Sequence, residues 1–186
     1  MIARLAPLCL MLCLAACGSS PKTSFYALDP VPAAHSTPIR APASPITVDH
    51  VELPSMLDRL SLVTEGPGNQ ISVSETDRWA SPLDEQVRRT LTADLQQRLP
   101  AGSVLAAGDP TPAGTRTIGL NVQQFVADAN GSVTLDADWS LHGRKTTGAV
   151  HHVSIHVASQ GKGGDAIAAN MSRALAQLAD RMSAEL

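Results

Sequence analysis

The amino-acid sequence predicts an α+β fold in two layers, with one mixed, mostly antiparallel sheet of about six strands and two main helices packed on one face. Apolar residues recur at three- or four-residue spacing over 81–99 and 165–182, which predicts two amphipathic helices. Apolar and polar residues alternate over 133–142, which predicts a strand with one buried and one solvated face. Since only 3% of the residues are aromatic, the core between these layers must be aliphatic.

The N-terminus carries the marks of an export signal. Residues 5–16 form an apolar run after a short basic start, and this run is shorter than the roughly 20 residues that span a bilayer. The sequence LAAC at 14–17 resembles the lipobox of bacterial lipoproteins. We therefore expect residues 1–16 to be a signal peptide that is cleaved between Ala16 and Cys17. The alternative is an ordinary signal peptide followed by a chance cysteine.

Cysteine usage supports lipid attachment at Cys17. Cys9 and Cys13 lie in the expected signal peptide, which leaves Cys17 as the one cysteine of the mature chain, without a partner for an internal disulfide. We expect a thioether-linked diacylglycerol and an N-acyl chain on Cys17, and no other cofactor. Because Gly18 follows, and not the aspartate typical of inner-membrane retention, the periplasmic face of the outer membrane is the expected location.

The mature chain is expected to begin with a lipidated tether, residues 17–45. Residues 25–28 could form a short strand within it, and residues 29–45 contain five prolines, which favour an extended strap over a helix or a central strand. Residues 46–186 are expected to form a single α+β domain.

Three strand-like runs open this domain. The apolar positions of residues 46–53 change phase part-way, which predicts a strand with an irregularity near His50. Two further runs, at 59–65 and 70–75, are separated by the turn-forming sequence Gly66-Pro67-Gly68-Asn69.

The first helix is predicted over residues 81–99. Ser81 is expected to cap it and Pro82 to occupy its first helical position. Its buried stripe consists of apolar residues at four-residue spacing: Leu83, Val87, Leu91, Leu95 and Leu99. Two ion pairs are expected on its exposed side, Asp84 with Arg88 and Glu85 with Arg89.

Two hairpins and a second helix complete the domain. Asn130-Gly131 is a strong signal for a tight turn, and residues 143–148 are expected to close the next hairpin. The last helix is predicted from about Asp165 to Met182 and is interpreted as a core helix, because its other face carries no basic cluster.

The sequence contains no catalytic motif, and we expect neither an enzyme nor a metal site. With a net charge of −3 and no basic block, nucleic acid is not expected as a partner. His152 and His156 lie four residues apart on one strand, or about 13 Å, too far to share a metal. If Trp139 pairs with Val153, then His156 faces Asp136 and His152 faces Ser140.

Three stretches in a fixed order resemble one family. FYAL follows the lipobox closely, VELPSMLDR comes next, and RWASPLDEQVRRTLTADLQQRLP opens the first helix. Together they resemble the PqiC-like family of ABC-type transport auxiliary lipoproteins over nearly the whole mature chain. The resemblance implies structural or partner-contact roles for the motif residues Tyr26, Leu53, Pro54, Asp58, Arg59, Trp79, Pro82 and Leu83. Met56-Leu57 departs from the family pattern, which has an aromatic residue in that segment.

The resemblance implies a non-catalytic docking or auxiliary subunit, anchored in the outer membrane by its lipid. Its partner would be the periplasm-spanning MCE-domain protein of a system that moves phospholipid or other hydrophobic cargo between membranes. A homo-oligomer, the cargo and the docking face are left open. The alternatives are a lipoprotein that binds a small ligand between helices and sheet, and an accessory protein of envelope assembly. Trp79 is expected to pack on the sheet, with partner contact as its alternative role.

Overall fold

A computed structural model of the chain describes residues 21–33, 41–143 and 146–186. The predicted signal peptide, the Cys17 anchor and the start of the tether lie outside the described residues. So do residues 34–40 of the proline-rich segment and residues 144–145 at the tip of the last hairpin.

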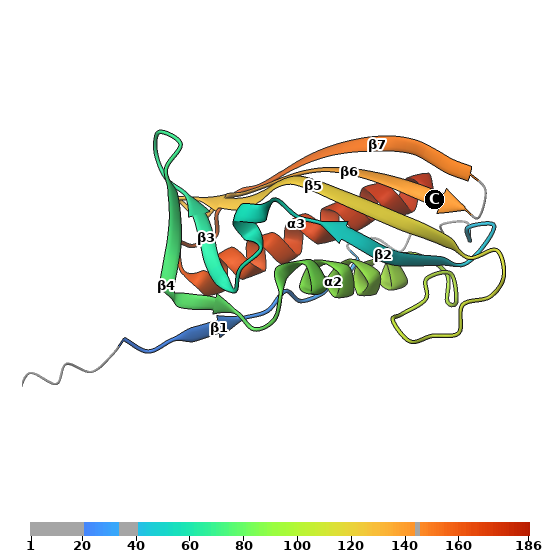
Figure 1. Cartoon of the computed structure of the whole chain (residues 1–186), viewed down its shortest axis with the longest axis horizontal. Coiled ribbons are helices and arrows are strands. Elements are labelled where there is room, and N and C mark those ends of the chain that lie inside the picture. Colours follow the sequence, from blue (N-terminus) through green and yellow to red (C-terminus); the bar gives the residue numbers. More distant parts are fainter. Residues whose placement is uncertain (1–20, 34–40, 144–145) are drawn as a thin grey trace, which may run out of the picture.

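Seven strands form one mixed sheet, with two helices packed against it (Figure 1). In chain order the elements are β1 (Ser24–Tyr26), β2 (Ile46–Glu52), the 3-10 turn η2 (Ser55–Leu57), β3 (Ser61–Glu65), β4 (Ile71–Trp79), α2 (Leu83–Arg98), β5 (Arg116–Asp128), β6 (Val133–Gly143), β7 (Thr146–Val157) and α3 (Gly164–Glu185). The strand order is β1-β4-β3-β5-β6-β7, and β2 also pairs with β5. The predicted fold class is therefore confirmed, with seven strands in place of about six.

Strand direction follows the length of each connection. The hairpins β3–β4, β5–β6 and β6–β7 are antiparallel, whereas β1–β4, β2–β5 and β3–β5 are parallel, which the longer stretches of chain between them allow. The predicted irregularity near His50 is confirmed as a register shift between Val48 and His50. The tight turn at Asn130-Gly131 is confirmed too: Gly131 has φ 87°, a value that glycine adopts without strain.

The register proposed for the last hairpin is wrong. Val153 pairs with Ala137, and Trp139 pairs with His151. Pairing already begins at Gly143 with Thr146, so the connection is shorter than the expected turn over 143–148 and the partners move by two residues. In consequence His151 faces the helix layer, where its ring stacks on Trp139 at a centroid distance of 4.4 Å.

The predicted leucine stripe on α2 is confirmed, since all five of its residues are buried. The predicted helix start is not. Pro82, with φ −49° and ψ 137°, occupies the N-cap, and no side chain caps the helix. Because Pro82 is itself extended, it takes the non-helical N-cap position and leaves Ser81 one residue outside the helix, where the Ser81 carbonyl accepts a bond from Gln86 Nε2 at 2.8 Å.

The two expected ion pairs on α2 are also absent from the described residues. Arg89 instead donates from Nη2 to the carbonyl of Leu28 at 3.0 Å, because the chain after β1 lies against this side of the helix. The last helix is longer than predicted, Gly164–Glu185 against 165–182. Neither helix that the structure describes combines the length and apolar character needed to cross a bilayer.

Candidate functional site

A pocket of about 470 Å³ opens where β2 ends, η2 turns and α2 begins. We call it the β2–α2 pocket. It brings together two stretches of chain that the sequence separates by more than twenty residues. Its lining residues are His50, Val51, Glu52, Leu53, Ser55, Leu57, Asp58, Arg59, Leu60, Pro82, Leu83 and Asp84. Five of the eight residues singled out by the family resemblance are therefore gathered here: Leu53, Asp58, Arg59, Pro82 and Leu83.

The local sequence explains the shape of this pocket. Pro54 stops β2 in an extended conformation, with φ −54° and ψ 138°, and the chain then folds into the short turn η2. Backbone bonds of 2.8 Å, from Leu57 N–H to the carbonyl of Pro54 and from Arg59 N–H to the carbonyl of Leu57, hold this turn. Leu57 is 4% exposed and fastens the turn to the core. This wall of the pocket is therefore built by the motif stretch VELPSMLDR itself.

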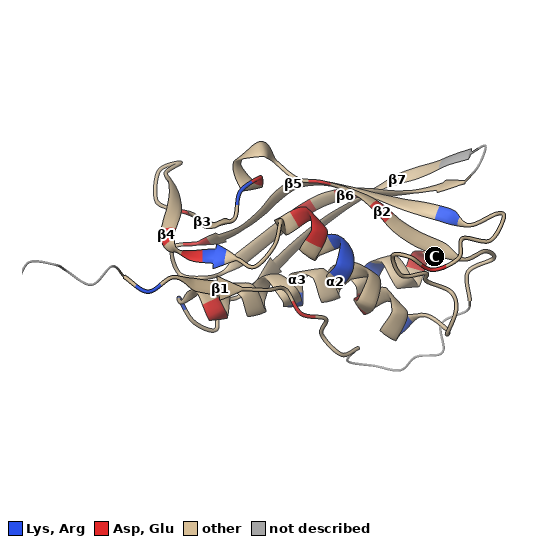
Figure 2. Ribbon diagram, turned by 60° about the horizontal axis from the view of Figure 1, so that its bottom comes forward, with Lys and Arg blue, Asp and Glu red and all other residues tan. Residues whose placement is uncertain are grey.

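The pocket has an apolar floor and a charged rim. Leu57 and Leu83 are buried, while Leu60 remains 43% exposed beside them. The rim carries the carboxylates of Glu52, Asp58 and Asp84 and the guanidinium of Arg59. Figure 2 shows the acidic first turn of α2, Asp84 and Glu85, in red, followed by basic residues in blue. The arrangement can bind an apolar group that is flanked by charge.

Trp79 lies in the core, with 3% of its surface exposed. Its backbone N–H donates to the carbonyl of Leu60 at 2.6 Å, which ties the end of β4 to the pocket wall. This burial favours the core role over direct partner contact. The motif Trp79-Ala80-Ser81-Pro82-Leu83 thus connects the sheet to the first turn of α2.

Tyr26 is placed away from the β2–α2 pocket. It pairs in register with Trp79, and its hydroxyl donates to Asp77 Oδ1 at 3.1 Å. Its ring lies over Gly164 at the start of α3, where a Cβ on the glycine would come within 2.5 Å of Cε2. Tyr26 therefore fixes the approach of β1 to α3, and Gly164 leaves room for the ring.

Residues 27–33, which we call the inter-helix segment, run from β1 along both helices (Figure 2). The side chain of Leu28 is fully buried between them. The helices hold the segment by its backbone. The N–H groups of Leu28, Asp29 and Val31 donate to Gln86 Oε1, Ser172 Oγ and Asp94 Oδ1 at 2.8, 3.1 and 2.9 Å, and the carbonyl of Leu28 accepts from Thr90 Oγ at 3.1 Å.

Sequence reasoning missed this contact, although the sequence carries a signal for it. Four polar residues on α2 recur at four-residue spacing, each one position before a leucine or valine of the buried stripe, and all are buried: Gln86, Thr90, Asp94 and Arg98. Such a stripe on the side of an amphipathic helix indicates that a polar partner, here the backbone of another segment, covers it.

Asp94 and Arg98 form a buried ion pair, with Oδ1 and Nη1 3.4 Å apart and side-chain exposures of 0% and 3%. Arg98 Nε also donates to Asp180 Oδ1 at 2.6 Å. Burial raises the pKa of Asp94 from 3.8 to about 6, against the lowering effects of the Val31 N–H and the Arg98 guanidinium; the neighbouring Asp180 raises it further. Asp94 Oδ2 is buried without a hydrogen-bond partner in the structure.

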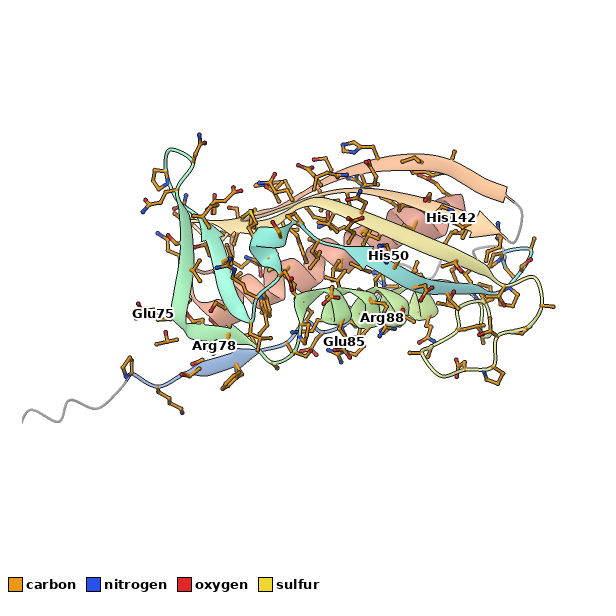
Figure 3. The ribbon with its side chains drawn as sticks, viewed as in Figure 1. His50, Glu75, Arg78, Glu85, Arg88 and His142 are labelled. Atoms are coloured by element: carbon orange, nitrogen blue, oxygen red, sulfur yellow. The ribbon has the colours of Figure 1, made fainter. Side chains whose placement is uncertain are left out.

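Most of the described histidines lie on the solvated side of the sheet or at its end, whereas His151 faces the helix layer beside Trp139. His142, on β6, pairs with Ser140 Oγ at 2.7 Å, and His152 pairs with Asp138 at 2.8 Å (Figure 3 labels His50 and His142). His50 Nε2 lies 4.0 Å from Glu52. Among the described residues, no three histidine, cysteine or acidic side chains are grouped as a metal site requires.

Comparison with known proteins identifies the family of the folded domain. The family model for the ABC-type transport auxiliary lipoprotein component matches residues 26–183, from the last residue of β1 to the last turn of α3. The chain belongs to this family. The resemblance drawn from the three sequence stretches is therefore confirmed.

Two named relatives agree with this membership. The chain is 30% identical over 95 residues to the intermembrane transport lipoprotein PqiC of Escherichia coli K12, covering 51% of this chain and 50% of the relative. The PqiC of Shigella flexneri matches with the same values. The chain thus spans about half the length of the curated relatives it matches.

Two crystal structures share the fold. One, of an uncharacterized protein, has a TM-score of 0.75 at 23% identity. The match covers 89% of this chain and 99% of that protein's chain. The other, of a Xanthomonas campestris protein, has a TM-score of 0.67 at 14% identity. This match covers 87% of the present chain and 94% of the Xanthomonas chain.

Proposed function

We propose that this auxiliary lipoprotein is a non-catalytic docking subunit, held at the periplasmic face of the outer membrane by acyl chains on Cys17. Its partner is the periplasm-spanning MCE-domain protein of a system that moves lipid or other hydrophobic cargo between membranes. Membership of the family and distant similarity to a lipoprotein of intermembrane transport support this role.

One structural observation carries the proposal. Five motif residues from two separate stretches of chain converge on a single open pocket, whose walls are fixed by backbone hydrogen bonds. Its lining combines apolar side chains with polar and charged ones, as in an interface that has an apolar centre and a polar rim. Trp79, buried at the end of β4, supports the pocket wall through its bond to the Leu60 carbonyl.

The proposal includes the domain organisation that the sequence predicts. Residues 1–16 are the signal peptide, 17–45 the lipidated tether and 46–186 the folded domain. Part of the tether, residues 27–33, is packed on the helices, so a shorter stretch after Cys17 separates the membrane from the domain. The tether therefore positions the domain as well as attaching it.

Membrane fractionation and co-purification test the proposal together. Cys17→Ser should shift the protein from the outer-membrane fraction to the soluble periplasmic fraction, since the mature chain contains no other cysteine for lipidation. The parent protein, extracted in mild detergent, should co-purify with the MCE-domain protein. A Cys17→Ser variant that still sediments with outer membranes would contradict the anchor, and absence of co-purification would contradict the docking role.

A lipoprotein that binds a small ligand is the second candidate, because the volume of the β2–α2 pocket falls in the range of small-molecule sites, about 300–1,000 Å³. Native mass spectrometry of the protein purified from membranes distinguishes the two. A stoichiometric bound small molecule favours the ligand binder. A neighbouring gene pair for an MCE protein and a membrane component favours the docking subunit.

A further inference from the structure

We infer that the β2–α2 pocket receives a peptide segment of the transport partner that presents one large apolar side chain flanked by lysine or arginine. This inference rests on the proposed docking function and names the surface and the chemistry of the contact. Three properties of the pocket support it: exposed apolar surface, an acidic rim whose one described internal contact is that of Glu52 with His50, and walls that are already ordered.

The floor favours an apolar anchor. Leu60 is one of few large apolar side chains that the described residues leave exposed, at 43%, and it lies beside the buried Leu57 and Leu83. A side chain that enters the pocket would cover this apolar surface and gain about 25 cal/mol for each Å² removed from water. A central apolar anchor surrounded by polar residues is the usual arrangement of an interface hot spot.

The rim favours a basic partner. Glu52, Asp58 and Asp84 oppose one guanidinium, that of Arg59, so the rim is acidic at neutral pH. Within the part of the chain that the structure describes, Asp58, Arg59 and Asp84 form no ion pair, and Glu52 has only the distant His50 at 4.0 Å. Their charges remain available to a partner, and opposite charge on that partner would steer it to the pocket.

The same charges disfavour a phospholipid head group as the occupant. A helix N-terminus by itself attracts phosphate, but the first turn of α2 carries Asp84 and Glu85, and these carboxylates would repel it. Figure 3 shows Glu85 on α2 ahead of Arg88, which lies further along the helix and does not line the pocket. A peptide with basic flanks fits this electrostatic environment better than an anionic lipid does.

The walls are ordered before any partner arrives. Bonds of 2.8 Å hold η2, and a 2.6 Å bond from Trp79 N–H fixes the carbonyl of Leu60. A pocket with this preformed backbone loses little conformational entropy on binding, so the contact of a single segment can be specific.

Binding measurements on full-length, detergent-solubilised protein test the inference, with the purified periplasmic part of the MCE-domain protein as the probe. Three variants address the pocket: Leu60→Ala removes the exposed floor, and Asp58→Lys and Asp84→Lys reverse the rim. Glu75→Lys is the matched control, because Glu75 is an exposed acid on β4 that does not line the pocket (Figure 3). Thermal melting of each variant verifies folding.

We expect each pocket variant to weaken binding about tenfold or more, the control to bind like the parent, and the parent's affinity to fall as salt increases. If the parent binds and all three pocket variants bind equally well, the pocket is not the contact site, whereas the docking function still stands. Failure of the parent to bind would overturn both. Tighter binding by Asp58→Lys and Asp84→Lys would show that the partner's contacting segment is acidic, and would also overturn the inference.

Discussion

Replacing Asp94 with asparagine should stabilise the protein at neutral pH. The pKa of Asp94 is raised from 3.8 to about 6, so the native state binds its proton more tightly than the unfolded chain does. The stability that this proton contributes is fully present below pH 4 and is lost as the pH rises through about 6. A shift of about 2 units corresponds to about 3 kcal/mol, at about 1.4 kcal/mol per unit.

Asparagine removes the buried charge but keeps an oxygen that can accept the Val31 N–H. We therefore expect Asp94→Asn to raise the free energy of unfolding by about 1–3 kcal/mol at pH 7.5 and to change it little at pH 4. The competing effect is the lost attraction to Arg98. It is the smaller one here, because Arg98 keeps its 2.6 Å bond to Asp180, which is half exposed.

Urea denaturation at several pH values, followed by tryptophan fluorescence, measures this difference in the mature chain carrying Cys17→Ser. Asp94→Leu is the matched control: it also removes the charge, but it leaves the Val31 N–H without an acceptor and should be about 1–3 kcal/mol less stable than Asp94→Asn. If Asp94→Asn is less stable than the parent at pH 7.5 by more than about 1 kcal/mol, or if the difference does not vary with pH, the reasoning is wrong.

Three further predictions concern the core, a close contact and the histidines. Trp79→Ala should cost about 3–5 kcal/mol in unfolding free energy, as expected for a buried aromatic, and a loss below about 1 kcal/mol by urea titration would refute its core role. Gly164→Ala should lower the melting temperature because the new methyl group meets the Tyr26 ring; combining it with Tyr26→Ala should restore part of the loss, and no recovery would contradict the contact. Metal chelators should leave the melting temperature unchanged, and a clear decrease on chelation would point to a histidine site.

Most of the fold could be predicted from the sequence because it depends on local periodicity. The leucine stripe of α2 and the alternation along β6 each lie within one continuous segment, and each has the burial that its spacing predicts. Two of the three motif stretches, VELPSMLDR and the one that begins RWASPLD, also contain most of the pocket lining. That they meet in one pocket could not be predicted, since neither periodicity nor spacing within a stretch specifies which stretches become neighbours in space.

The errors arise where distant residues decide the structure. Arg89 was expected to pair with Glu85, four residues away, but it bonds to the carbonyl of Leu28, 61 residues away. The helix start shifted because the conformation of Pro82 outweighs the capping tendency of Ser81. The register of β6 with β7 depends on where pairing begins near the turn, at Gly143 and Thr146, and alternation alone does not reveal this.

The inter-helix segment also determines how mechanical load would enter the molecule. If the chain is anchored through Cys17, a pull from the membrane reaches the fold first through β1, a three-residue strand at the edge of the sheet, and next through Leu28 and its neighbours. Their backbone bonds to β4, α2 and α3 would part in sequence and lengthen the tether, while the long strands β5, β6 and β7 carry none of the force directly. The segment would thus lengthen under load and limit the force that movement of the membrane transmits to the folded domain.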